Sequence, residues 1–185
     1  MSVSSAPSAT QNVTRTRLSN GLTILVVPNP VADIISARIF IRAGQSQEVA
    51  EQAGLFNLLA SLLTRGTAHR SSRDIAEAVE DVGANLGADA ASDYSLVSLK
   101  TVSSDFETIF RLAAEILRQP SFPDKEIELE RKLTLQGIRS MQEQPFTVAY
   151  SRLRETMYAG HPYSFSSLGT AEAVTALDQA ALQQA

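Results

Sequence analysis

The chain has 185 residues, of which 44% are hydrophobic and 19% charged, and its formal net charge is −4. This length and composition indicate one globular domain with a substantial core and argue against a disordered, collagenous or low-complexity chain. Lys and Arg are not in excess, so nothing favours nucleic acid as a partner. The absence of cysteine excludes disulfide bonds, thiolate metal sites and a cysteine nucleophile.

The sequence shows neither a membrane-spanning segment nor a signal peptide. No apolar run is long enough to span a bilayer, and no N-terminal segment has the pattern of a signal peptide. We therefore expect a soluble protein without membrane insertion, and its compartment stays unassigned. Residues 1–13 are rich in Ser, Ala and Thr and predict a flexible tail, whereas residues 14–185 predict a folded domain.

The first elements along the chain are predicted to be β-strands. The dipeptide Asn20-Gly21 lies between the β-rich runs 13–18 and 22–27, which is the typical pattern of a β-hairpin. In residues 35–42 aliphatic side chains alternate with Ser, Arg and Phe. This alternation predicts a strand with one buried face.

Helical spacing begins near residue 54. Leucines recur at the spacing of one helix face and predict a buried stripe: Leu55, Leu58, Leu59 and Leu62. A second helix is predicted from Ser72, taken as its N-cap, to Gly83. Two strands are predicted next, over residues 84–90 and 94–102.

After these strands the chain is mainly helical. Ser104 and Glu107 predict a capping box at the start of a helix. A long charged helix is predicted over residues 123–144, with an ion pair between Glu128 and Lys132.

The last part of the chain predicts a helix that begins at Pro145, a loop over residues 160–170 and a short helix near Asp178. Paired strands followed by helices indicate an α+β fold, in which a mostly antiparallel sheet is covered by helices.

Five segments in this order resemble the N-terminal domain of the pitrilysin-like zinc metallopeptidases, the family of insulinase and mitochondrial processing peptidase. They are LSNGLTILVVPNP (18–30), ISARIFIRAG (35–44), GLFNLLASLLTRGT (54–67), SFPDKEIELERKLTLQGIRSMQEQP (121–145) and GHPYSFSSLGTAEAVTAL (160–177). The resemblance covers about residues 14–185 and implies one domain of a clamshell. It further implies that the chain is a fragment that lacks the last strand and the C-terminal domain.

The metal site of this family is where the chain departs from the pattern. Active members carry the motif His-x-x-Glu-His on the first helix. The resemblance places Asn57 and Ser61 at the two His positions and Ala60 at the Glu that activates water. The third ligand, a Glu on the later long helix, corresponds to Gly137, and an accessory Glu seven positions earlier corresponds to Glu130. We therefore expect no catalytic residue, no bound metal and no zinc or other cofactor.

The chemistry of these side chains agrees with that expectation. Asn57, Ala60 and Ser61 share one face of the predicted helix. A catalytic zinc needs three strong donors and an open position for water. The oxygens of Asn and Ser are weak zinc donors, and Ala and Gly offer no side-chain donor. Without a metal-bound water or a carboxylate at position 60, metal-assisted hydrolysis lacks its nucleophile and its base.

Other polar residues offer weaker alternatives. Ser61 as a nucleophile would need a neighbouring base, and neither His69 nor His161 can be placed beside it from the sequence. His69 lies in a polar segment and is interpreted as solvated. His161 belongs to a loop that resembles the family, and a structural role is favoured over a catalytic one.

A small-residue strand is the candidate peptide-binding element. In active relatives the equivalent strand lies at a sheet edge and captures an extended peptide by β-addition. The corresponding residues here are Ala84, Asn85, Leu86, Gly87 and Ala88. Their small size would allow a close backbone approach. An ordinary strand, with alanines that pack tightly, explains them equally well, and both interpretations stay open.

The resemblance as a whole predicts a catalytically silent homologue that pairs with a zinc-bearing subunit, or with a second family domain, to enclose peptides. The alternative is a structural core subunit of a larger complex without a proteolytic role. An active metalloendopeptidase is the least favoured reading. The substrate, the identity of the partner and the oligomeric state are not given by the sequence.

Overall fold

The computed structural model describes residues 13–185, so residues 1–12 of the predicted tail lie outside the described part. The chain divides into two compact units, residues 1–33 and residues 34–185, and each is described by itself. Within residues 13–185 no helix is both long and apolar enough to cross a membrane.

The described part of the first unit is the predicted β-hairpin. Strand β1 (Thr14–Arg17) pairs antiparallel with β2 (Thr23–Val26). Gly21 in the turn has a φ of 89°, a conformation that glycine adopts without strain. The side-chain oxygen of Asn20 accepts the N–H of Leu22 at 3.1 Å. The Asn-Gly signal therefore predicted this turn correctly.

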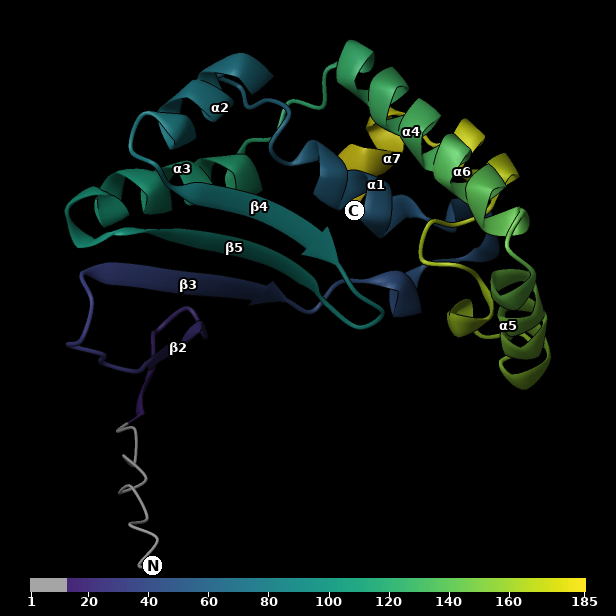
Figure 1. The fold of residues 1–185 in the computed structure, drawn as a ribbon, viewed down its shortest axis with the longest axis horizontal. Coiled ribbons are helices and arrows are strands. Elements are labelled where there is room, and N and C mark those ends of the chain that lie inside the picture. Colours follow the sequence, from purple (N-terminus) through teal and green to yellow (C-terminus); the bar gives the residue numbers. More distant parts are fainter. Residues whose placement is uncertain (1–12) are drawn as a thin grey trace, which may run out of the picture. The chain divides into compact units, whose positions relative to one another are not determined.

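The second unit is built on a three-stranded antiparallel sheet. Its strands are β3 (Ile34–Ile41), β4 (Asn85–Ala90) and β5 (Ser95–Val102), in the order β3-β5-β4. The central strand β5 pairs with both neighbours, so that β3 and β4 are the two edges among residues 34–185 (Figure 1). The predicted α+β fold with an antiparallel sheet is confirmed.

Seven α-helices accompany the sheet within residues 34–185. They are α1 (Leu55–Leu62), α2 (Ser72–Glu80), α3 (Phe106–Arg118), α4 (Asp124–Gln142), α5 (Pro145–Met157), α6 (Ala171–Ala176) and α7 (Gln179–Gln184). Helices α2 and α3 pack against β4 and β5 on one face of the sheet. Helix α1 contacts β4 on one side and α4 on the other, which places it beside the edge of the sheet (Figure 1).

The core lies between the sheet and these helices. Val97 and Leu99 of β5 pack in one cluster with Ile109 and Ile116 of α3 and with the leucine stripe of α1. Within the stripe Leu58 and Leu62 are fully buried, Leu55 is 5% exposed, and Leu59 is half-buried. Burial of this stripe holds α1 against the sheet, as its periodicity predicted.

Two predicted helix starts are wrong in detail. The N-cap of α2 is Ser71, not Ser72: the Ser71 hydroxyl accepts the N–H of Asp74 at 3.2 Å, and the Asp74 carboxylate accepts the N–H of Ser71 at 2.8 Å. The predicted capping box of Ser104 and Glu107 does not form, because residues 103–105 make a short 3-10 turn before α3 begins. Glu107 instead pairs with Arg111.

Two further differences concern the later helices. Glu128 of α4 pairs with Arg131, one turn away at i+3, and not with the predicted partner Lys132. Helix α6 was not predicted; the Thr170 hydroxyl caps it by accepting the N–H of Ala173 at 3.1 Å. The loop before it is confirmed apart from a 3-10 turn over residues 162–164, and the short helix after Asp178 is α7.

Candidate functional site

Helix α1 carries the side chains that the family resemblance assigns to the metal-binding motif. Ala60 is buried at 5% exposure, whereas Asn57 and Ser61 are half-buried. The Ser61 hydroxyl donates to the backbone carbonyl oxygen of Asn57 at 3.1 Å, which is a local bond within the helix. Among residues 13–185 no basic side chain accepts the proton of this hydroxyl, so this geometry does not activate Ser61 as a nucleophile.

A buried carboxylate fixes the start of α1. The Glu48 side chain is 4% exposed and accepts the N–H of Gly54 and the N–H of Phe56, each at 2.9 Å. These are donors that the first turn of a helix leaves without an intrahelical partner. Burial raises the pKa of Glu48, although the two N–H bonds oppose that shift. The role of Glu48 is not apparent from the sequence, because this residue lies well before the helix that it caps.

A close backbone contact sets the position of the same helix end. Gly54 has a φ of 97° and Gly169 a φ of 81°. A Cβ atom at Gly169 would lie 2.0 Å from the carbonyl oxygen of Ala53, and one at Gly54 would lie 2.6 Å from that of Leu168. The segment around residue 169 can therefore reach α1 only because both positions are glycine.

The accessory carboxylate Glu130 comes from α4, which packs along α1. Glu130 is 7% exposed, and its Oε1 lies 2.7 Å from Nη2 and 3.0 Å from Nε of Arg65. Arg65 follows α1 in the chain, so this ion pair joins the two helices. The sequence pointed to Glu130 but missed its partner, which lies 65 positions away.

Gly137, which the resemblance places at the third ligand, lies on the same helix two turns beyond Glu130. A Cβ atom there would lie 3.2 Å from Cδ1 of Leu168, so an apolar side chain borders the position. Zinc is the metal that the motif implies, and this donor set does not fit it. Asn57 and Ser61 are weak donors, Ala60 and Gly137 have no donor, and the one nearby carboxylate is paired with Arg65. Within residues 13–185 no three His, Asp or Glu side chains gather in an arrangement suited to a metal ion.

Strand β4 is an edge of the sheet among residues 34–185 and covers Asn85 to Ala90, while Ala84 lies just before it. At the turn into β5 the N–H of Ala91 donates to the carbonyl oxygen of Tyr94 at 2.8 Å. Backbone groups alternate in direction along an antiparallel strand, so those of Leu86 and Ala88 point away from β5. This pattern leaves the backbone of β4 geometrically suited to pair with an extended peptide.

The two histidines lie away from these residues in the sequence and in their contacts. His69 is exposed in the segment between α1 and α2. Nδ1 of His161 accepts the N–H of Tyr163 at 3.1 Å, and the two rings pack edge to face. The Tyr163 hydroxyl in turn bonds to Asp93 in the β4–β5 turn. His161 therefore helps to hold its loop against the sheet, in keeping with a structural role.

The hollows on the described residues include two that border the helices named above. The larger, about 670 Å³, lies between the end of α4, α5 and residues 164–172. The smaller, about 170 Å³, lies between α1, α2 and β4 and is bordered by Thr64, Arg65 and Leu86. Neither is bordered by Asn57, Ala60 or Ser61.

Comparison with known proteins decides the family. The model of the family described as "Insulinase (Peptidase family M16)" matches residues 23–171. The chain belongs to this family. The resemblance inferred from the five sequence segments is thereby confirmed.

Individual relatives agree with the M16 assignment. The chain is 28% identical over 170 residues to an uncharacterized zinc protease of Mycobacterium leprae, covering 92% of this chain and 38% of the relative. It is 26% identical over 179 residues to a probable mitochondrial-processing peptidase subunit beta of Schizosaccharomyces pombe, covering 97% of this chain and 39% of the relative. The M16 chain thus spans about two fifths of the length of these curated relatives.

A solved structure extends the likeness to the fold. The crystal structure of a peptidase M16 inactive domain from Pseudomonas fluorescens superposes with a TM-score of 0.89 at 27% identity. The match covers 94% of this chain and 42% of that chain.

Proposed function

We propose that this M16 domain is catalytically silent and forms part of a peptide-binding chamber, which a zinc-bearing M16 domain or subunit completes. The observation that carries the proposal is the donor set between α1 and α4. The motif positions hold Asn57, Ala60 and Ser61, and Glu130 is engaged by Arg65. Such a site supplies neither a metal-bound water nor a general base.

The rest of the domain supports a role that retains the family architecture. Helix α1 is held in place by Glu48, by its leucine stripe and by the contact between Gly54 and Gly169. The edge strand β4 lies beside this helix and offers backbone groups for an extended peptide. A similar domain from Pseudomonas fluorescens is described as inactive. Loss of the metal ligands without loss of the fold is what a non-catalytic partner requires.

The first test is metal binding by the purified chain. After incubation with zinc and dialysis, elemental analysis should detect well under one zinc per chain, because positions 57, 61 and 137 offer no strong zinc donor. A variant with Asn57→His, Ala60→Glu, Ser61→His and Gly137→Glu should bind zinc in isothermal titration. The matched control omits only Gly137→Glu and should bind more weakly. Stoichiometric zinc between α1 and α4 of the natural chain would contradict the proposal.

The second test concerns the partner. The chain should elute together with a zinc-bearing M16 chain encoded in the same genome, and the mixture should cleave peptides that this chain alone leaves intact. Stable association with a larger complex that has no peptidase activity would instead support a structural subunit.

A further inference from the structure

One face of the sheet is not covered by α2 and α3. Along β5 the side chains of Ser95, Val97, Leu99 and Thr101 are buried, and those between them point to the opposite face. We call this opposite face, which α2 and α3 do not cover, the open face. Side chains of directly opposed residues in an antiparallel sheet share a face. The register therefore assigns these residues to the open face: Ile34, Ser36, Arg38 and Phe40 of β3, Leu96, Ser98, Lys100 and Val102 of β5, and Asn85, Gly87 and Asp89 of β4.

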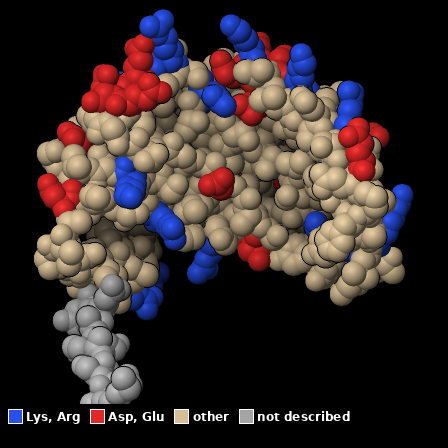
Figure 2. Space-filling view, viewed as in Figure 1, with Lys and Arg blue, Asp and Glu red and all other residues tan. Residues whose placement is uncertain are grey.

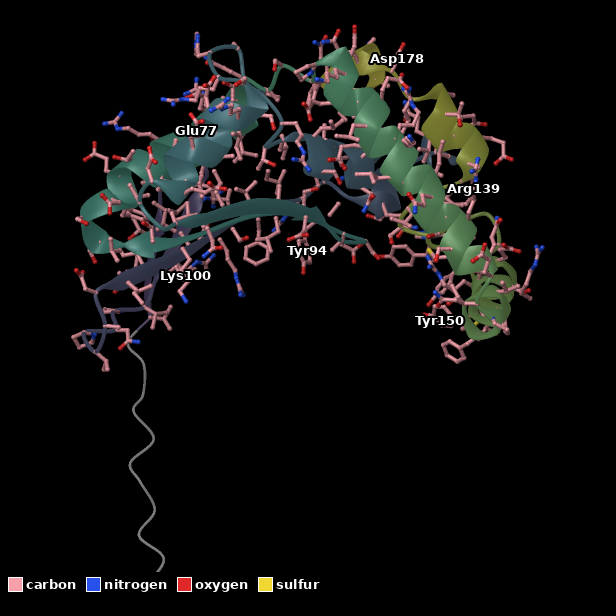
Figure 3. All side chains as sticks on the ribbon, turned by 45° about the horizontal axis from the view of Figure 1, so that its top comes forward. Glu77, Tyr94, Lys100, Arg139, Tyr150 and Asp178 are labelled. Carbon is pink, nitrogen blue, oxygen red and sulfur yellow. The ribbon has the colours of Figure 1, made fainter. Side chains whose placement is uncertain are left out.

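Two basic side chains of the open face have no acidic partner. Arg38 lies opposite Ser98, and Lys100 lies opposite Ser36, so that Arg38 and Lys100 are diagonal neighbours. Both are exposed, and neither takes part in an ion pair among the described residues. In Figure 3, Lys100 and Tyr94 extend from the same side of the sheet.

The charge of this face differs from that of the whole chain. The formal net charge is −4, yet Figure 2 shows Lys and Arg side chains over β3 and β5 and a group of acidic side chains over α2. The acidic residue of the open face is Asp89, which lies opposite Leu96. It is four residues along β4 from Asn85, the residue opposite Lys100. The part of the face that contains Arg38 and Lys100 is therefore basic and attracts anionic groups.

The residues between the free edge and Arg38 are small, whereas Asn85 lies between that edge and Lys100. Gly87, Ser98 and Arg38 form one row across the three strands. A Cβ atom built at Gly87 has no other atom within 4 Å, so the space above it is open. A peptide strand paired to β4 would run about 10 Å from β5, since neighbouring strands are roughly 4.8 Å apart. An extended Lys100 and a Glu side chain of the peptide can meet across that distance.

We propose that the open face selects acidic side chains of an extended peptide that pairs with the free edge of β4, with Lys100 as the direct contact and Arg38 reinforcing it. This proposal rests on the proposed peptide-binding function and assigns it a substrate class.

The experiment compares three labelled ten-residue peptides that differ only at alternate positions, which carry Glu, Gln or Lys. Fluorescence anisotropy with the 185-residue chain at low salt should give the tightest binding for the Glu peptide. Its dissociation constant should be about two- to tenfold below that of the Gln peptide, as expected for two exposed charge pairs. The difference should shrink in 0.5 M salt, because exposed charges are screened.

Variants test the two residues directly. Arg38→Ala with Lys100→Ala should remove the preference for Glu over Gln while binding of the Gln peptide persists. The matched control is Arg118→Ala with Lys125→Ala, which deletes the same two charges from exposed positions on α3 and α4 and should keep the preference. Circular dichroism checks that the variants fold. Lys100→Gln alone is a milder variant and should reduce the preference for the Glu peptide over the Gln peptide by half or more.

The outcomes separate the two proposals. If none of the three peptides binds, peptide binding itself fails, and the selectivity fails with it. If all three bind with equal affinity, or if the double variant keeps the preference, the selectivity is overturned while peptide binding stands.

Discussion

At the scale of single residues, two carboxylates of this domain respond to their surroundings in opposite ways. Burial raises the pKa of Glu48 above its usual value of 4.5. The Thr67 hydroxyl, followed by Arg70, holds the pKa of Glu115 below the same value. Ionisation of Glu48 therefore costs stability as pH rises above about 4.5. Ionised Glu115 instead stabilises the fold at neutral pH, and this contribution is lost as pH falls through its lowered pKa.

The contribution of Glu115 can be measured by Glu115→Gln. Thr67 donates to Glu115 at 2.6 Å and Arg70 at 3.2 Å, and the neutral amide weakens both bonds. We expect the free energy of unfolding at pH 7 to fall by about 1 to 2 kcal/mol. The difference from the natural chain should shrink as pH falls from 4.5 through the lowered pKa of Glu115, since this carboxylate of the natural chain then becomes protonated too.

Urea denaturation at several pH values provides the measurement. Glu107→Gln is the control, because Glu107 and its partner Arg111 are both 77% exposed and such a pair contributes little. A pH-independent difference for Glu115→Gln would show that its charge does not stabilise the fold.

At the scale of elements, the junction between α1 and the segment before α6 depends on glycine. Gly169→Ala should lower the free energy of unfolding by at least about 2 kcal/mol, because φ is 81° and the new methyl group would overlap the carbonyl oxygen of Ala53. Gly87→Ala in β4 is the matched control. It meets no atom within 4 Å and should change stability by less than about 1 kcal/mol.

Thermal and urea denaturation of both variants would check this expectation. Equal stability of the two variants would mean that the contact between Gly169 and Ala53 can relax without cost. The position of α1 would then depend on its leucine stripe and on Glu48 alone.

At the scale of the whole molecule, residues 27–33 form the end of the first unit and lead from β2 to the start of the second unit at Ile34. These residues are exposed and belong to no helix or strand. Exposed irregular segments are preferred sites of proteolysis. Brief digestion with elastase should therefore cut after Val31 or Ala32 before it cuts within residues 34–185.

Mass spectrometry identifies the first cuts, and circular dichroism of the larger product should retain its helical signal. Early cleavage inside β3, β5 or α3 would contradict the division into two units at residue 33.

Several properties of this M16 domain follow from the sequence by itself, because they depend on near neighbours in the chain or on side-chain chemistry. The Asn20-Gly21 hairpin, the alternation in β3 and the leucine stripe of α1 are local patterns, and the structure contains all three elements. The sequence alone also shows that positions 57, 60, 61 and 137 carry Asn, Ala, Ser and Gly, none of which is a strong zinc donor. The helix caps were harder to predict from the sequence, because a 3-10 turn before α3 takes the place of the capping box expected from Ser104 and Glu107.

Other properties were decided only by the tertiary structure, because they join residues from distant segments. Glu130 meets Arg65 across 65 positions, and Gly169 touches the backbone of Ala53. The edge position of β4 depends on which strands pair, and the sequence does not specify strand order. The basic pair of Arg38 and Lys100 likewise exists only because β3 and β5 are neighbours in one register, which brings two separated charges onto the same face.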